Sequence, residues 1–480
     1  MLLVFSLRSA ALRRAVLGAA LLAAASAGAA RAAPAQGGTW ALTNARIETV
    51  TRGVIERGTI VIRDGLIAAV GANVTPPPDA RVVDMGARTV YPGFIDLTST
   101  LGLPAAAAPA GGFGGGRGAA APDAPAGTPI GLEPERSVAR EIRPAAADIR
   151  ATRDAGVTAA LVAPARGALR GVSALVPLRD TGLAERVLRS PVALHMGFQA
   201  VAGRYPGTLL GVIAYERQAL YDAQRHGALL DRYRTNPRGM ERPEFDPALD
   251  ALVPVVRGTL PAFFEANNEN EIRRAVRIGK EFDLTLTVVG ATEGFRALDA
   301  LKGARPVVVS VNFPRAPDVT GWSYRSTQRH PLTDSARVDS AVRKLVEGNA
   351  AALHRAGVRF ALASGGARGE FLANVRKAVA AGLPRETAVE ALTIRPAEIA
   401  GVADVMGSIE VGKIANLVVA DANLLSDSGR VREVFVDGER YEVASPARAG
   451  RGGGGRTVAG AGGAGGGGAP VGIAGSWTVV

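Results

Sequence analysis

The sequence predicts an α/β protein: a (β/α)8 TIM-like barrel with a small composite β-sandwich domain built from N- and C-terminal segments. Three observations predict this fold. The middle of the chain alternates short β-rich runs with helical stretches, residues 40–90 and 408–443 are both β-rich, and 47% of the 480 residues are hydrophobic. Strands that alternate with helices favour a parallel sheet, and about eight such units fit a closed barrel whose site lies at the strand C-termini.

Residues 1–33 have the pattern of an export signal. Arg13 and Arg14 add positive charge, residues 16–30 form an apolar run without charge, and Ala30–Ala32 resembles a signal-peptidase site. The apolar run is shorter than the roughly 20 residues that span a bilayer. We therefore expect a periplasmic or secreted protein with no stable membrane span after cleavage. An uncleaved anchor is the alternative, and the arginine pair leaves twin-arginine export open beside ordinary secretion.

The two β-rich segments are expected to form one domain. Residues 41–50, 59–70 and 81–90 have β character, and Asp64-Gly65 is typical of a hairpin turn. The segment 408–443 repeats this pattern near the other end of the chain. Because each segment alone has too few strands to be stable, we expect both to share one sheet.

Residues 91–407 carry the alternating pattern of the barrel. Strands are expected at 158–163, 192–195, 262–265, 285–289, 307–311 and 359–363, and helices at 145–154, 208–230, 269–282, 294–301, 335–356 and 371–381. Two Gly-rich segments cannot bury enough apolar surface to order themselves, so residues 105–129 are expected to be a loop and 446–480 a tail. No positioned lysine or helix start follows the first segment, which argues against a phosphate-binding loop.

The composition excludes several classes of function. The chain has no cysteine, so disulfides, thiolate zinc sites and a cysteine nucleophile are excluded, and it has four histidines. The net charge is +12, but only five of the 56 basic residues are lysine, so 56 − 5 = 51 are arginine. These arginines are scattered along the chain and form no stripe, so we expect no nucleic-acid partner.

Four stretches carry a family likeness. Tyr91–Asp96 resembles the first barrel strand of the amidohydrolase superfamily, and residues 42–71 resemble that family's N-terminal β segment. Residues 391–421 resemble its closing helix and returning β segment, and 154–180 are similar to a region of imidazolonepropionase-like members. The resemblance covers about residues 40–443. It implies a hydrolase of non-peptide carbon–nitrogen bonds that uses zinc or another divalent metal.

The family's metal motif is incomplete in this chain. The family pattern Asp-x-His-x-His on the first strand corresponds here to Asp96, Thr98 and Thr100. The position of the family's bridging lysine corresponds to His195, and that of its fifth-strand histidine to Glu265. Threonine hydroxyls are poor zinc ligands because they stay protonated near neutral pH.

Two further family positions have no side chain at all. The sixth-strand histidine corresponds to Gly290, and the eighth-strand aspartate to Gly365. That aspartate would also have moved the proton of the attacking water. The resemblance therefore implies that the family's metal is absent, and we expect neither a metal nor another cofactor.

Asp96, His195 and Glu265 are the candidates for remaining chemistry. Two carboxylates near a barrel mouth can perform acid–base catalysis, and a histidine can act as a base. The alternative is structural: Asp96 holds neighbouring backbone, Glu265 pairs with an arginine, and His195 is a hydrogen-bonded core group. His226, His330 and His354 are expected to be structural; Glu216, Arg217 and Asp222 are expected on a solvated helix face.

Two functions follow from this pattern. The first is an exported, non-catalytic member of the superfamily that binds a small-molecule ligand or a partner, including a homo- or hetero-oligomer with a related chain. The alternative is an active hydrolase with a site rebuilt around the three candidates. An interaction module carried by the Gly-rich arms is a weaker third reading, because those arms lack charge and aromatic patterns.

Overall fold

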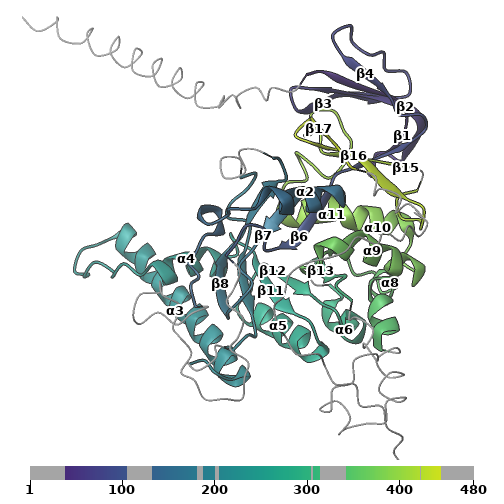
Figure 1. The fold of residues 1–480 in the computed structure, drawn as a ribbon. Coiled ribbons are helices and arrows are strands. Elements are labelled where there is room, and N and C mark those ends of the chain that lie inside the picture. Colours follow the sequence, from purple (N-terminus) through teal and green to yellow (C-terminus); the bar gives the residue numbers. More distant parts are fainter. Residues whose placement is uncertain are drawn as a thin grey trace, which may run out of the picture. The chain divides into compact units, whose positions relative to one another are not determined.

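The structure is a computed structural model that describes residues 38–104, 132–180, 187–200, 205–303, 306–313, 342–421 and 423–444. The expected export signal, the 105–129 loop and the 446–480 tail lie outside these residues, as does His330. Within them the protein is a mixed α/β structure with three sheets. Figure 1 shows its elements in the colours of the sequence.

Strands from both ends of the body form one eight-stranded sheet. Its order is β17-β16-β15-β5-β1-β2-β3, with β4 paired to β1. The strands are β1 (Trp40–Glu48), β2 (Val54–Arg63), β3 (Leu66–Gly71), β4 (Arg81–Asp84), β5 (Thr89–Pro92), β15 (Leu417–Asp421), β16 (Arg430–Val436) and β17 (Glu439–Glu442). In Figure 1 the purple N-terminal strands lie beside the yellow C-terminal ones. Strand β5 joins the two segments, because it pairs in parallel with β1 and antiparallel with β15.

This sheet curls over its own core instead of packing against a second sheet. The rings of Trp40 on β1 and Phe435 on β16 lie 6.3 Å apart, although β5 and β15 separate these strands. Three strand spacings of about 4.8 Å in a flat sheet would hold them much farther apart. The expected sandwich is therefore a single bent sheet. Its hairpin turn falls at Asp64-Gly65, as expected, and both residues have positive φ.

The other two sheets share one run of chain. The six-stranded sheet has the order β14-β13-β12-β11-β10-β8, and the three-stranded sheet has the order β6-β7-β9. Their strands are β6 (Phe94–Ser99), β7 (Val157–Val162), β8 (Leu169–Val172), β9 (Ala174–Pro177), β10 (Leu194–Gly197), β11 (Ala262–Ala266), β12 (Leu286–Gly290), β13 (Val307–Ser310) and β14 (Phe360–Ala363). Only Ser173 separates β8 from β9, so a continuous wall runs from β6 to β14.

The run that bridges the sheets is antiparallel to both neighbours. Strand β9 pairs antiparallel with β7, and β8 pairs antiparallel with β10. The alternation of strands and helices predicted parallel neighbours throughout, and no strand was expected here. The prediction missed it because the run 169–177 returns antiparallel to β7 without an intervening helix.

The wall does not close into a hydrogen-bonded ring among the described residues. No backbone ladder joins β6 to β14 there, and the expected closed barrel is not seen as such. Side chains cross this seam instead: Ser364, which follows β14, donates from its backbone N (3.0 Å) and its Oγ (2.6 Å) to the carboxylate of Asp96 on β6.

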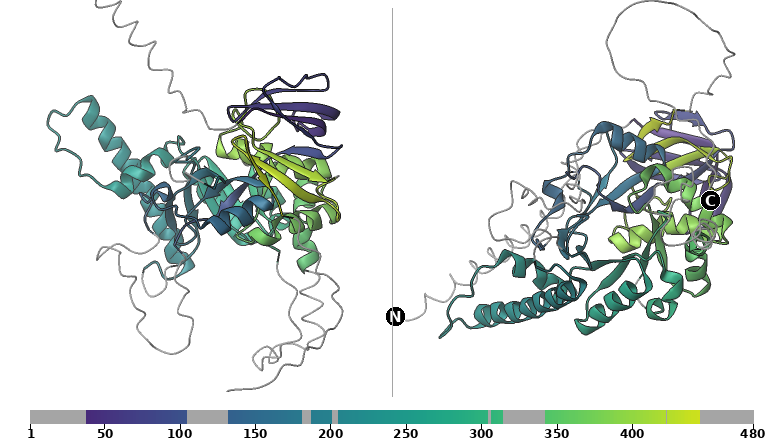
Figure 2. Two further views of the ribbon diagram at one scale, coloured as in Figure 1. Left: turned by 45° about the horizontal axis from the view of Figure 1, so that its top comes forward. Right: turned by 60° about the horizontal axis from the view of Figure 1, so that its bottom comes forward.

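Helices cover the wall. They are α2 (Ala146–Asp154), α3 (Leu209–Thr235), α4 (Pro247–Val256), α5 (Glu269–Glu281), α6 (Leu298–Leu301), α8 (Asn349–Arg355), α9 (Phe371–Ala380), α10 (Arg385–Leu392) and α11 (Ile394–Ala400), with short 3-10 turns at Val138–Arg140, Gly294–Arg296 and Arg368–Glu370. Two further views show the helices outside the strands (Figure 2). Local sequence sets their starts: Asn268 and Glu271 form a capping box at α5, and Asp246 caps α4 ahead of Pro247.

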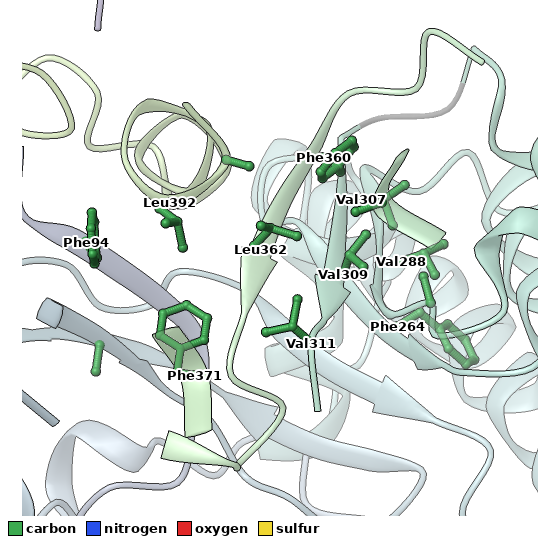
Figure 3. Packing of buried hydrophobic residues seen from close by; sticks show 14 of the residues in the cluster. Phe94, Phe264, Val288, Val307, Val309, Val311, Phe360, Leu362, Phe371 and Leu392 are labelled. Atoms are coloured by element: carbon green, nitrogen blue, oxygen red, sulfur yellow. The ribbon is translucent and has the colours of Figure 1, made fainter. Parts of the chain in front are cut away.

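Buried apolar side chains hold helices and strands together. Figure 3 shows Phe94 of β6, Leu362 of β14, Phe371 of α9 and Leu392 of α10 in one cluster, all 2% exposed or less. This packing fixes the inner strands and so the carboxyl ends from which the cavity is built. None of the described helices is both long and apolar enough to cross a bilayer.

Candidate functional site

A cavity of about 400 Å3 opens at the carboxyl ends of the wall strands. Six of the residues that the sequence singled out line it: Thr98, Thr100, His195, Glu265, Gly290 and Gly365. They come from β6, β10, β11, β12 and the turn after β14, which are far apart in the sequence. Asp96 lies directly beneath, bonded to Thr98. The site is where a parallel strand arrangement places it, at the strand C-termini.

Asp96 is buried and fully engaged by the protein. Besides Ser364, it accepts hydrogen bonds from the backbone N and the Oγ1 of Thr98, both at 3.2 Å. The Thr98 hydroxyl in turn accepts from Gly365 N at 2.8 Å. Oδ1 accepts three of these four hydrogen bonds and Oδ2 accepts one. The side chain is 1% exposed and does not line the cavity, so this carboxylate serves to hold the seam between β6 and β14.

Glu265 is paired with an arginine that sequence reasoning did not identify. Arg170 on β8 donates from Nη1 to Glu265 Oε2 and from Nε to Gly167 O (2.8 Å). The Glu265 side chain is 42% exposed and that of Arg170 only 6%. Asn267 Nδ2 lies 3.3 Å from the second oxygen of Glu265. The carboxylate that corresponds to the family's fifth-strand ligand position is therefore paired with a guanidinium.

His195 is a buried, neutral imidazole on β10. Its ring packs edge-on against Phe263, with centroids 5.4 Å apart. Burial, with a smaller contribution from the charge of Arg170, lowers the pKa of His195 to about 3. Its Nε2 is buried without a hydrogen-bond partner in the described chain. The structural alternative of a hydrogen-bonded core histidine is therefore wrong for this nitrogen, and the group cannot serve as a proton donor at neutral pH.

Glu216 corrects an expectation. It was expected on a solvated helix face, but on α3 its side chain is fully buried and faces inward. Neither carboxyl oxygen has a hydrogen-bond partner among the described residues. Burial raises the pKa of Glu216 well above its usual range, against the opposing charge of nearby Arg170. The signal that could have found it is its 3.6-residue spacing from the buried Val212 and Leu220.

A side chain at either of the two cavity glycines would have to displace a neighbouring polar side chain. A Cβ at Gly290 would collide with Asn267 Oδ1, and one at Gly365 would collide with Ser310 Oγ. Both glycines also have positive φ, +98° and +57°, which side-chain-bearing residues adopt only with strain. Neighbouring polar side chains have thus taken the space in which the family's ligands would stand.

The residues present do not fit the family's divalent metal. Asp96 is buried outside the cavity lining and already accepts four hydrogen bonds, and Glu265 is paired with Arg170, so His195 is the one candidate ligand left among the described lining residues. No three histidine, aspartate or glutamate side chains of the described ranges come together closely enough to hold an ion. A zinc ion would also lie next to the Arg170 guanidinium, and the lining carboxylate, Glu265, is already paired with that cation.

The two other histidines that the structure describes, His226 and His354, do not line the cavity. His226 Nε2 lies 2.9 Å from Asp250 Oδ1 and links α3 to α4. His354 Nδ1 lies 3.4 Å from the Thr387 hydroxyl, between α8 and α10. Both placements agree with the structural role expected from the sequence.

Comparison with known proteins gives one family. The model of the amidohydrolase family matches residues 266–441. Dihydroorotases of Anaeromyxobacter sp. (strain K) and Anaeromyxobacter dehalogenans (strain 2CP-C) are 40% identical over 83 residues and 46% identical over 66 residues. These segments are 15% and 12% of this chain and span only 19% and 15% of those relatives' length.

The fold is shared over a longer stretch. An amidohydrolase of Thermotoga maritima MSB8 has a solved structure that matches 84% of this chain and 99% of its own, with a TM-score of 0.67 and 23% sequence identity. At that identity the similarity concerns the fold and not the reaction.

Proposed function

We propose that the chain is a metal-free member of the amidohydrolase superfamily whose cavity binds a small-molecule ligand instead of hydrolysing it. The observation that carries this proposal is the ion pair of Arg170 with Glu265. It places a fixed positive charge against the carboxylate that stands at a family ligand position. The cavity volume of about 400 Å3 is in the range of small-molecule sites.

The architecture supports a retained barrel with altered chemistry. We propose that the wall from β6 to β14 corresponds to the family's (β/α)8 barrel, with the Asp96–Ser364 contacts replacing a ladder at the seam. A preserved scaffold around a changed site is consistent with selection for binding rather than for metal-assisted hydrolysis.

Location and partners follow the sequence pattern. We propose export to the periplasm or the medium, because residues 1–33 combine a charged start, an apolar run and a cleavage-like site. We also propose that the protein associates with a second copy of itself or with a related catalytic chain. Such an association would explain why the fold is preserved although the metal motif is not.

Hydrolysis assays test this function. Purified protein, dialysed against chelator and then supplied with zinc, is compared on cyclic amides and dipeptides. We expect no turnover above buffer in either state. Zinc-dependent hydrolysis that is lost in Glu265→Gln but kept in Glu241→Gln, an exposed carboxylate outside the cavity, would overturn the proposal.

The second candidate is a hydrolase with a rebuilt site. His195 and Glu265 do line one cavity, which favours it. Three features argue against this candidate. Asp96 is buried and already accepts four hydrogen bonds, and Glu265 is paired with Arg170. His195 has a lowered pKa and no carboxylate to orient its ring. Metal-independent hydrolysis that is abolished by His195→Gln would establish this candidate in place of the first.

A further inference from the structure

Uncharged hydrogen-bonding groups dominate the polar lining of the cavity. They are the hydroxyls of Thr98, Ser99, Thr100, Thr292 and Ser310 and the amides of Asn267 and Asn312. Several are occupied by the protein itself: Thr292 Oγ1 donates to Asn267 O, and Asn312 Nδ2 donates to Gly365 O, both at 3.0 Å. The Thr100 hydroxyl has no partner in the described chain and is exposed.

The charged groups around the cavity cancel or are already satisfied. Arg170 and Glu265 form an ion pair, and Asp96, which lies outside the cavity lining, accepts four hydrogen bonds. Glu216 on α3 does not line the cavity, and burial raises its pKa; burial lowers the pKa of His195, which does line the cavity, to about 3. No lining side chain is therefore left as an unpaired charge that would call for an ion of opposite sign.

One buried group points to a missing partner. His195 lines the cavity, is only 6% exposed, and keeps Nε2 without a hydrogen bond in the described residues. A buried polar atom without a partner costs free energy, so such an atom beside a cavity marks a place where a bound molecule or water completes the bonding.

Resting on the ligand-binding function proposed above, we infer that the cavity selects a small, uncharged, polar molecule that bonds to its hydroxyl and amide side chains, and discriminates against ions of either sign. An anion would have to take Arg170 from Glu265 and leave that carboxylate uncompensated beside it. A cation would have to approach the guanidinium. A neutral molecule with several donors and acceptors leaves the pair intact and meets Thr100 and the amides.

Three probes of one size and different charge test this selection. Succinamide is neutral, succinate is a dianion and 1,4-diaminobutane is a dication, and all three have a four-carbon chain. Ligand-observed NMR at constant ionic strength measures their dissociation constants on the full protein. We expect succinamide to bind at about 10 mM or tighter, as a molecule of this size can, and at least tenfold more tightly than either ion.

A variant locates the binding. Thr100→Val removes an unpartnered cavity hydroxyl, and should weaken succinamide binding about threefold to tenfold, the effect of one lost hydrogen bond. Thr75→Val is the matched control, because Thr75 is exposed on the composite sheet domain, away from the cavity. Equal effects of both variants would contradict the assignment.

The outcomes separate this inference from the function beneath it. Tighter binding of succinate or 1,4-diaminobutane, or no saturable binding of succinamide, overturns the neutral-ligand inference. If the cavity binds an ionic probe without metal and without turnover, the ligand-binding function stands and only the selectivity fails. If zinc binds and supports hydrolysis, the function itself fails.

Discussion

At the scale of single residues, the electrostatics of the site and its surroundings depend on two buried ionisable groups that lie outside the family motif. Arg170 and Glu216 lie on β8 and α3, on elements that carry none of the family's motif residues. Sequence alone could not identify them, because Arg170 is one of 51 arginines and Glu216 is followed by Arg217 in a charged stretch. What the sequence did predict is the pairing of Glu265 with an arginine, since a carboxylate at a strand end needs a counter-charge.

The buried carboxyl of Glu216 makes a prediction about pH. Its folded pKa is raised above the unfolded value, so the folded state favours the protonated form, and stability is lost as pH rises above the unfolded pKa. Glu216→Gln keeps the shape and removes the ionisation. We expect the free energy of unfolding of the variant to rise relative to that of the wild type as the pH increases from 5 to 8, by at most about 1.4 kcal/mol per pH unit.

Urea denaturation at several pH values measures this difference. Glu281→Gln is the control, because hydrogen bonding by Arg217 lowers the pKa of Glu281. Its contribution is present above the unfolded pKa and is lost as pH falls, so the control should differ from the wild type at neutral pH and converge with it in acid. A flat pH profile for Glu216→Gln relative to wild type would refute the buried acid.

The cavity glycines make a second prediction at this scale. In Gly365→Ala the new Cβ collides with Ser310 and the backbone has a positive φ, in Gly366→Ala the backbone has a positive φ of +86° without a collision, and in Gly369→Ala neither problem arises. We expect the free energy of unfolding to fall by about 2–4 kcal/mol for Gly365→Ala, about 1 kcal/mol for Gly366→Ala and about 0 kcal/mol for Gly369→Ala. Denaturant melts of the three variants check this order, and equal losses at Gly365 and Gly369 would show that the space at Gly365 is open.

At the scale of elements, the seam between β6 and β14 depends on one carboxylate. Asp96→Asn replaces one of the two acceptor oxygens by an NH2 donor, either Oδ1, which accepts from Ser364 N, or Oδ2, which accepts from Ser364 Oγ, so one of these buried hydrogen bonds is lost or must reverse. We expect a loss of about 1–3 kcal/mol in the free energy of unfolding. Asp79→Asn, which removes an exposed ion pair with Arg63 and alters an exposed hydrogen bond from Thr39 Oγ1, should cost under about 0.5 kcal/mol. Similar losses in both variants would argue against a structural role for Asp96.

The elements also show where sequence patterns suffice and where they fail. Strong periodicity predicted α5 and α9 almost to their ends, and the cap at Asn268 explains the start of α5. The antiparallel run 169–177 was missed because its two strands have only four residues each and match neither period. The helix expected at 294–301 is broken into a 3-10 turn and a short α-helix, since Gly294 and Ala297 are buried beside Asn349 and α8.

At the scale of the whole molecule, the composite sheet and the wall are coupled. Arg385 of α10 donates to Glu48 Oε1 (2.8 Å) on β1 and to the Tyr91 hydroxyl (2.9 Å) on β5. Strand β5 also covers β15, whose Leu417 and Val419 are fully buried. Removing the N-terminal strands would therefore expose apolar surface on both sides.

Truncation tests this coupling. Deletion of residues up to 92 removes β1–β5 and should abolish a single cooperative thermal transition, because β15 loses its partner and its core. Deletion of residues 445–480, beyond the compact unit that ends at Val443, should leave the melting temperature unchanged. A folded, cooperative fragment beginning at Gly93 would show that the two parts are independent.

We propose that the guanidinium of Arg170, together with the altered ligand positions, takes the place of the family's metal ion. The zinc content of the purified protein tests this proposal most directly. It is measured by elemental analysis, for the wild type and for Arg170→Met, after incubation with excess zinc and removal of loosely bound ions. We expect less than about 0.1 zinc per chain in the wild type, since zinc needs several well-placed ligands and the cavity offers one free imidazole. One or two stoichiometric zinc ions in the wild type, lost on Glu265→Gln, would contradict the account.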